Sequence, residues 1–194
     1  MGNSFSCRRR PAKLRPNMPI LQVRVFGLGQ SGKQSIVGFL KNGKPCLDRS
    51  LDNENMDMQW ITHKNVKMLF WVSEQAIDKE IANETVGVRA LIYVVDGSDP
   101  SRLPLARDHL HYQLKNATGT PHLLILLNKC DNPSFVFLEE AHDALDLDKV
   151  SDRHVRIYAC SAATGEGIRE GLDWLCSKFY INKGIYISRK GTTS

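Results

Sequence analysis

The segment VFGLGQSGKQSIV, residues 25–37, holds the side chains best suited to chemistry with phosphate. Its glycines fit the dinucleotide-binding pattern G-x-G-x-x-G. Together with Lys33 they also fit the P-loop pattern G-x-x-x-x-G-K-[ST], except that Gln34 takes the last position. Either loop presents backbone N–H groups at a helix N-terminus, where they attract phosphate. The lysine favours the P-loop, because its ammonium can reach the outer phosphates. The alternative is a glycine turn that binds nothing.

A dinucleotide site would also need an acidic residue about 20 residues further on, at the end of the next strand. Asp52 and Glu54 lie near that distance, but the surrounding DRSLDNENMD does not resemble a strand end. We therefore expect a P-loop. The residues expected to surround the phosphates are Gly27, Leu28, Gly29, Gln30, Ser31, Gly32, Lys33, Gln34 and Ser35.

The tetrapeptide NKCD, residues 128–131, follows an apolar run and indicates which base the site takes. The Asp131 carboxylate can accept hydrogen bonds from N1–H and the 2-amino group of guanine, two donors that adenine lacks. The aliphatic stem of Lys129 can cover the plane of the base, and Asn128 can tie this loop to the P-loop. Such a tetrapeptide is common alone, but after a P-loop and at a strand end it predicts guanine binding.

A third loop, CSAATGEG at residues 160–167, follows the next apolar run. A tight turn at Ser161, Ala162 and Ala163 can offer a backbone N–H to the 6-oxo group of guanine. The alternative is a helix entry with Thr164 as its N-cap, and the two roles are compatible.

These loops need elements to position them, and the hydrophobic pattern supplies a regular alternation. Two nearly all-apolar runs, 90–96 and 122–128, are typical of strands covered on both faces. Strands separated by helices predict an α/β fold with a mainly parallel, doubly wound sheet. The expected strands are 20–26, 56–63, 66–72, 90–96, 122–128 and 154–160, and the expected helices are 33–42, 101–116, 134–145 and 165–179. Trp60 and Trp174 fit apolar faces, so we expect both in the core.

Composition limits the classes of function. The chain has 194 residues and a net charge of +5, but Arg8, Arg9, Arg10, Lys13 and Arg15 supply all of that excess. A nucleic-acid-binding protein should carry its positive charge on the folded body, so nucleic acid is not an expected partner. Five cysteines without a C-x-x-C pair favour reduced thiols in the cytosol and argue against a zinc site. No apolar run approaches the roughly 20 residues of a membrane-spanning helix.

The motifs together resemble the ADP-ribosylation factor (Arf) and Arf-like branch of the Ras superfamily. GLGQSGKQSIV resembles its P-loop, LIYVVDGSDPSRLPLAR its central strand and following helix, LLNKCDNP its base-recognition loop, TGEGIREGLDWL its last helix and MGNSF its myristoylated start. The resemblance implies the small G-protein form of the P-loop NTPase fold, a mostly parallel six-stranded sheet with helices on both faces. It also implies GTP and GDP as ligands and a role in membrane trafficking or signalling.

The chain departs from that family where the family binds magnesium. A Ser or Thr normally follows the P-loop lysine, and here it is Gln34. When FWVSEQ is aligned with the family motif W-D-V-G-G-Q, Trp71 replaces the aspartate and Glu74 a glycine, while Gln75 matches the glutamine that orients water. Magnesium requires oxygen donors in near-octahedral geometry, which tryptophan cannot supply. We therefore assign no metal ligand, with Gln34 as the one remaining candidate, and expect weak or absent hydrolysis with Gln75 as its only catalytic candidate. A shifted alignment in which Asp57 or Glu74 serves the metal is the alternative.

The N-terminus predicts membrane attachment. The segment MGNSFS fits the myristoylation pattern M-G-x-x-x-[ST], which makes Gly2 the lipid acceptor. One myristoyl chain anchors a protein only marginally. Cys7 can add palmitate, and each nearby cation can add about 1 kcal/mol at an anionic surface. We expect a disordered lipidated tail at 1–18, a G domain at 19–181 and a second tail at 182–194, with the protein peripheral on the cytosolic face of a membrane. A plain basic tail is the alternative.

Three functions fit these residues. The first is a membrane-anchored guanine-nucleotide-binding module with weak or absent hydrolysis. The second is a competent GTPase switch with unusual metal partners, and the third is a scaffold of the same fold that binds no nucleotide. The protein effectors are not identified by the sequence.

Overall fold

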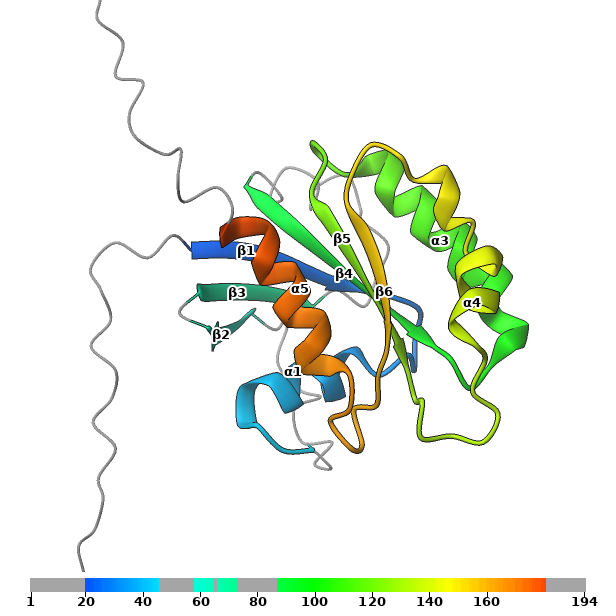
Figure 1. The fold of residues 1–194 in the computed structure, drawn as a ribbon. Helices are drawn as coiled ribbons and strands as arrows, with labels where there is room; N and C mark the ends of the chain where they lie inside the picture. The colour runs from blue at the N-terminus through cyan, green and yellow to red at the C-terminus, as the bar shows by residue number, and fades with distance from the viewer. Residues whose placement is uncertain (1–19, 46–57, 65, 73–86, 181–194) are drawn as a thin grey trace, which may run out of the picture.

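The computed structural model describes residues 20–45, 58–64, 66–72 and 87–180. These residues form one six-stranded sheet with the order β2-β3-β1-β4-β5-β6 (Figure 1). Its strands are β1 (Ile20–Phe26), β2 (Met58–His63), β3 (Val66–Val72), β4 (Val88–Asp96), β5 (His122–Asn128) and β6 (Val155–Ala159). Only the β2–β3 pair is antiparallel. The predicted mostly parallel sheet is therefore confirmed.

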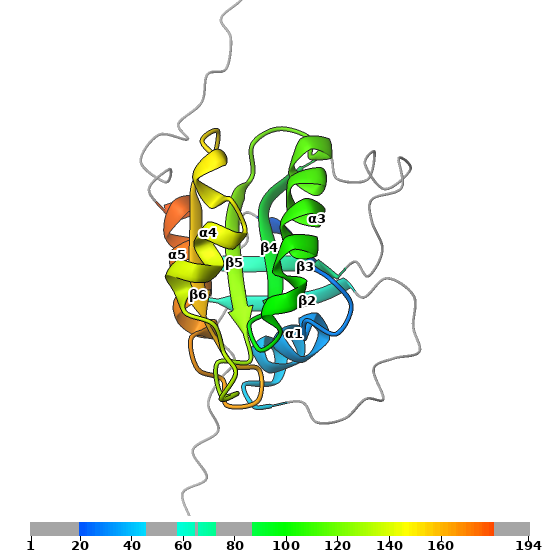
Figure 2. The ribbon, with the colours of Figure 1, turned by 90° about the vertical axis from the view of Figure 1, so that its right-hand side faces the viewer.

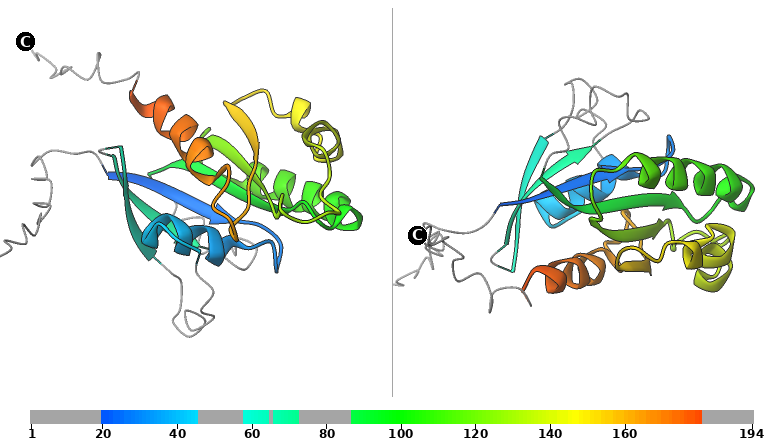
Figure 3. Two further views of the ribbon diagram at one scale, coloured as in Figure 1. Left: turned by 60° about the horizontal axis from the view of Figure 1, so that its bottom comes forward. Right: turned by 90° about the horizontal axis from the view of Figure 1, so that it is seen from above.

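Helices cover both faces of the sheet, as Figures 2 and 3 show. They are α1 (Lys33–Asn42), α3 (Leu103–Asn116), α4 (Leu138–Ala144) and α5 (Ile168–Tyr180), with short 3-10 turns at Pro100–Arg102 and Leu147–Lys149. Alternate residues of the central strands point to opposite faces. Ile92 and Val94 thus pack with α1 and α5, whereas Tyr93 and Val95 pack with α3 and α4. The two apolar runs read from the sequence, at 90–96 and 122–128, separate these two halves of the core.

Three expected helices begin later in the chain than predicted: α3 begins at Leu103, after the 3-10 turn, instead of at residue 101, and α4 and α5 also start late. The chain was expected to turn helical at residue 165, but α5 begins at Ile168 because Gly165 and Gly167 have left-handed backbones with φ of 87° and 71°. A Cβ at Gly167 would lie 1.9 Å from the carbonyl oxygen of Ala159, so this position requires glycine. The helix expected at 134–145 begins at Leu138, because a turn in which Asn132 accepts the Ser134 N–H precedes it.

The expectation that both tryptophans lie in the core is half correct. Trp174 on α5 packs partly buried against the core, but the Trp60 side chain is 49% exposed. Trp60 lies on the outer face of the edge strand β2, where the ammonium of Lys67 sits 4.3 Å from its ring centroid. On that strand Ile61 is the buried residue, because the alternation of side chains turns it inward.

The sheet and its helices all fall within the G domain expected at 19–181. The two expected tails, 1–18 and 182–194, lie outside the described residues. None of the described helices has the length and apolar character to cross a membrane.

Candidate nucleotide-binding site

The P-loop joins the end of β1 to the start of α1, as its motif predicts. Gly27 and Gly32 have φ of 153° and 93°, and both lie against other segments of the fold. A Cβ at Gly27 would lie 2.2 Å from the Val94 carbonyl oxygen, and one at Gly32 would lie 2.2 Å from Asn128 Nδ2. Glycine at these two positions therefore lets the loop pack closely on β4 and β5.

The P-loop lysine lies folded over its own loop. Lys33 is 4% exposed, and its Nζ donates hydrogen bonds to the carbonyl oxygens of Gly27 at 3.1 Å and Leu28 at 3.0 Å. Arg102 supports the same loop from outside, since its Nη1 donates to the Gly29 carbonyl at 3.1 Å. The first turn of α1 has no acidic residue. This end of the helix is therefore electropositive and suited to phosphate.

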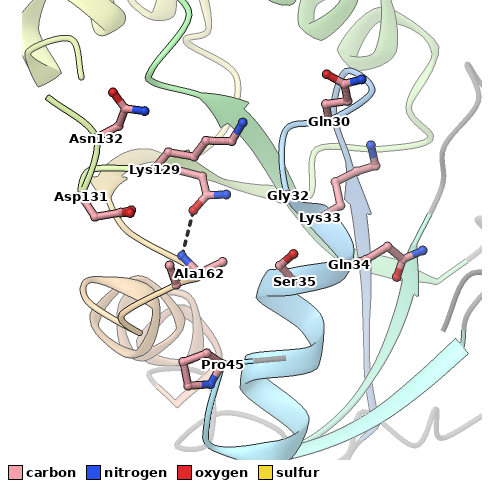
Figure 4. Close-up of a pocket in the computed structure, with 12 residues that line it drawn as sticks. Gln30, Gly32, Lys33, Gln34, Ser35, Pro45, Lys129, Asp131, Asn132 and Ala162 are labelled. Atoms are coloured by element: carbon pink, nitrogen blue, oxygen red, sulfur yellow. Dashed lines mark hydrogen bonds between the residues drawn. The ribbon is translucent and has the colours of Figure 1, made fainter. Parts of the chain in front are cut away.

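A pocket of about 460 Å³ opens between this loop and the two loops that follow β5 and β6 (Figure 4). Figure 4 shows the Asp131 carboxylate and the Ser35 hydroxyl pointing into it. The lining residues are Gln30, Gly32, Lys33, Gln34, Ser35, Pro45, Asn128, Lys129, Asp131, Asn132, Ala162 and Ala163. The predicted phosphate and base residues thus meet in one cavity. The other predicted residues, Gly27, Leu28, Gly29, Ser31 and Ser161, are outside that lining, and their contacts support the loops.

Asn128 holds the three loops together, in the role expected of it. The residue is 2% exposed at the end of β5. Its Nδ2 donates to the Ser31 carbonyl at 2.8 Å, and its Oδ1 accepts the Ala162 N–H at 3.0 Å, the dashed line in Figure 4. The thiol of Cys160 also approaches Oδ1 at 3.9 Å. One amide therefore sets the distance between the phosphate loop and the base loops.

In the turn after β6, the backbone N–H groups expected to meet guanine already donate hydrogen bonds within the protein. Ser161 is fully buried, and its Oγ accepts the N–H groups of Ala163 and Thr164, each at 3.1 Å. The Ala162 N–H is bonded to Asn128. A 6-oxo group at this turn would therefore share or displace one of these bonds. Thr164 does not cap α5, because its Oγ1 accepts the N–H of Glu166 in the glycine-rich turn before that helix.

Asp96 is a site residue that the sequence reading did not single out. It ends β4 in register with Asn128, and its Oδ2 accepts a 2.5 Å hydrogen bond from Lys129 Nζ. Burial alone would raise the pKa of Asp96, but hydrogen bonds from Lys129 and Ser98 hold that pKa below its usual value. The carboxylate is therefore ionised. The sequence does show an acidic residue at the end of an apolar run. It does not show that the loop holding Lys129 lies beside that residue.

The two thiols near the pocket are not poised as nucleophiles. Burial and the carboxylates of Glu166 and Asp131 raise the pKa of Cys130. Burial raises the pKa of Cys160 further. A cysteine is reactive as its thiolate, so both side chains are inert at neutral pH.

The two described positions that the resemblance assigns to magnesium hold Gln34 and Trp71. Gln34 points away from Asp131 and Ala162 in Figure 4. Trp71 lies on β3 with a buried Nε1 that has no hydrogen-bond partner among the described residues, and an indole offers no lone pair to a metal. Within the described ranges, no group of three His, Cys, Asp or Glu side chains could hold a metal ion by itself, but magnesium beside phosphates needs fewer protein ligands than that. Asp57, Glu74 and the catalytic candidate Gln75 lie outside the described residues.

Comparison with known proteins gives consistent matches. The model of the ADP-ribosylation factor family matches residues 12–179. ADP-ribosylation factor-like protein 1 of Saccharomyces cerevisiae is 32% identical over 178 residues, covering 90% of this chain and 95% of the relative. The protein of the same name from Drosophila melanogaster is 28% identical over 166 residues, covering 84% of this chain and 91% of the relative.

A solved structure shares the fold. The Arl6 (BBS3) small GTPase of Trypanosoma brucei, determined with the bound nucleotide analogue GppNp, superposes with a TM-score of 0.68 at 23% identity. The match covers 84% of this chain and 99% of the other.

Proposed function

Because the chain belongs to the ADP-ribosylation factor family of small GTPases, within the Ras superfamily, we propose that it is a membrane-anchored guanine-nucleotide-binding module. It takes GTP and GDP in the pocket between the P-loop and the base loops. It hydrolyses GTP slowly or not at all, and it acts in trafficking or signalling by presenting its nucleotide-bound surface to protein partners.

One observation carries the nucleotide part of this proposal. Lys33 and Asp131 line the same pocket, and Asn128 bonds both loops that flank it. Phosphate recognition requires the first residue and guanine recognition the second, so their convergence favours one ligand with both groups. The volume of about 460 Å³ is in the range of pockets that enclose such a ligand.

The residues that replace the family's magnesium partners support the proposal of weak hydrolysis. Phosphoryl transfer depends on neutralising the charge that develops on the transferred group, and the family uses a metal ion for this. Here Trp71 offers no oxygen, and the Gln34 amide stands where the family motif has a hydroxyl. Binding by backbone N–H groups and Lys33 does not need the metal, so the protein should bind nucleotide but not turn it over.

Nucleotide titration with and without magnesium tests these points. We expect GDP and GTP to bind wild type with similar affinity in EDTA and in magnesium, with no phosphate release. Lys33→Ala should weaken both, and Asp131→Asn should weaken both while ATP stays a poor ligand. Lys44→Ala, an exposed lysine outside the pocket lining, is the matched control for charge. Binding that requires magnesium and leads to phosphate release would refute the proposal, as would the absence of any guanine nucleotide binding.

Membrane attachment is proposed from the N-terminal sequence. Gly2 fits the myristoylation pattern, and Cys7 with the five following cations supplies the second signal that stable anchoring needs. Fractionation of cells that express wild type, Gly2→Ala or the neighbouring control Asn3→Ala tests it. We expect only Gly2→Ala to move to the soluble fraction. Equal partitioning of wild type and Gly2→Ala would contradict the anchor.

A further inference from the structure

We infer that Asp96 is a positioning residue for guanine: its carboxylate holds the ammonium of Lys129, so that the aliphatic stem of that lysine forms a fixed wall of the base site. The inference rests on the proposed guanine binding and adds to it a residue that contacts no nucleotide. Asp96 and Lys129 are 33 residues apart in sequence.

The two oxygens of Asp96 have different partners. Oδ1 accepts the backbone N–H of Ser98 at 3.0 Å and its hydroxyl at 2.6 Å, which fixes the plane of the carboxylate. Oδ2 accepts the Lys129 ammonium at 2.5 Å. The Asp96 side chain is 11% exposed, against 37% for Lys129. A carboxylate that is oriented by its own turn before the lysine arrives is a preorganised partner.

The backbone of Lys129 is also held in an unusual conformation. Its φ is 71°, in the left-handed region that a lysine seldom adopts. Neighbouring hydrogen bonds support the turn: the Asn132 N–H donates to the Lys129 carbonyl at 2.9 Å, and the Cys130 N–H donates to the Cys160 carbonyl at 3.0 Å. Main chain and side-chain tip are thus both restrained, and the methylene groups between them have little freedom.

The position of the restrained stem gives this pair its function. Lys129 lines the pocket beside Asp131, and Figure 4 shows its ammonium directed toward the end of β4 and away from Asp131. Because Asp96 pairs with the ammonium, Lys129 contributes through its apolar stem, which can pack on the face of a purine. A lysine free in solvent would lose rotamer freedom on binding. Asp96 removes that cost before the nucleotide arrives.

This arrangement separates affinity from base selection. All purines have a flat face, so a wall that packs on that face strengthens binding without distinguishing guanine from hypoxanthine. Asp131 makes that distinction, because it accepts a bond from the 2-amino group, which hypoxanthine lacks. Loss of the Asp96–Lys129 pair should therefore weaken GDP and IDP binding by the same factor, whereas loss of the Asp131 carboxylate should weaken GDP binding more.

The test measures GDP and IDP affinity for the full-length protein. Asp96→Asn should weaken both nucleotides about tenfold, the usual effect of losing a charged hydrogen bond, and should leave their ratio unchanged. Asp99→Asn is the matched control: Asp99 lies three residues after Asp96 in the same loop, and its carboxylate accepts the hydroxyl of Ser101. Lys129→Met keeps an apolar stem but lacks the ammonium, and should resemble Asp96→Asn. In the Lys129→Met background, Asp96→Asn should have no further effect.

Three results would overturn the inference. One is an Asp96→Asn variant that binds GDP and IDP as tightly as wild type, while Asp131→Asn still lowers the affinity for GDP relative to that for IDP. That result would leave the proposed guanine binding intact. Another is an Asp96→Asn effect of equal size with and without Lys129, which would indicate a general structural role. The third is no binding of GDP or IDP by wild type, which defeats the proposed function itself. Lys129→Met tests the pair from the other side if Asp96→Asn fails to fold.

Discussion

Replacing Asn128 by alanine should destabilise the fold even in the absence of nucleotide. The side chain is 2% exposed and bonds two backbone groups, the Ser31 carbonyl at 2.8 Å and the Ala162 N–H at 3.0 Å. Truncation leaves both without this partner. Each unpaired buried polar group costs about 1–3 kcal/mol, so we expect a loss of about 3 kcal/mol, because water can reach part of the gap from the pocket.

Urea denaturation at 25 °C, followed by circular dichroism, measures this loss. In a thermal scan it corresponds to a drop in Tm of about 6–12 °C for a domain of this size. Asn132→Ala is the matched control in the same loop. Its Oδ1 accepts an exposed bond from the Ser134 N–H, so the variant should stay within about 0.5 kcal/mol of wild type. A loss below about 1 kcal/mol for Asn128→Ala would refute the reasoning, since the bonds would then not hold the loops together.

Three further predictions follow from packing and burial. Gly32→Ala should destabilise the protein by more than about 2 kcal/mol in urea, because its Cβ would lie 2.2 Å from Asn128 Nδ2 and its φ is 93°. Gly29→Ala should change little, because its Cβ would have no described atom beyond its chain neighbours within 4 Å; equal effects of the two changes would contradict this account. Burial and two nearby cations lower the pKa of His109 in the folded protein. As the pH drops below about 6.5, this histidine is therefore protonated in the unfolded chain before it is protonated in the folded one, and the free energy of unfolding should fall. Urea midpoints should show a flatter pH profile for His109→Gln, and an unchanged slope would count against it. Burial raises the pKa of the Cys176 thiol to about 11, so this thiol should not react with iodoacetamide in the folded protein at about pH 8. Peptide mass spectrometry should find Cys176 unlabelled, and rapid labelling would contradict its burial.

The elements themselves could be predicted from the sequence because their signals are local. The bounds expected for β1, α1, β3 and β5 agree with the structure, since apolar runs and helical periodicity are properties of neighbouring residues. The phosphate and guanine motifs were readable for the same reason, because each lies within a few residues of a strand end. The roles expected of Gln75, Gly2 and Cys7 stay predictions, because these residues lie outside the described part of the chain.

Contacts between segments were decided only by the tertiary structure. Asp96 meets Lys129 because β4 lies beside β5 in register, with Asp96 opposite Asn128, and no local pattern specifies which strands become neighbours. Trp60 is exposed because β2 turns Ile61 toward the core and Trp60 to the opposite, outer face, and the sequence alone did not say which face the core covers. Asn128 reaches the Ser31 carbonyl only because Gly32 lacks a side chain where the amide must pass. The sequence therefore determined which residues could bind a nucleotide, while the packing of the strands determined which other residues hold them in place.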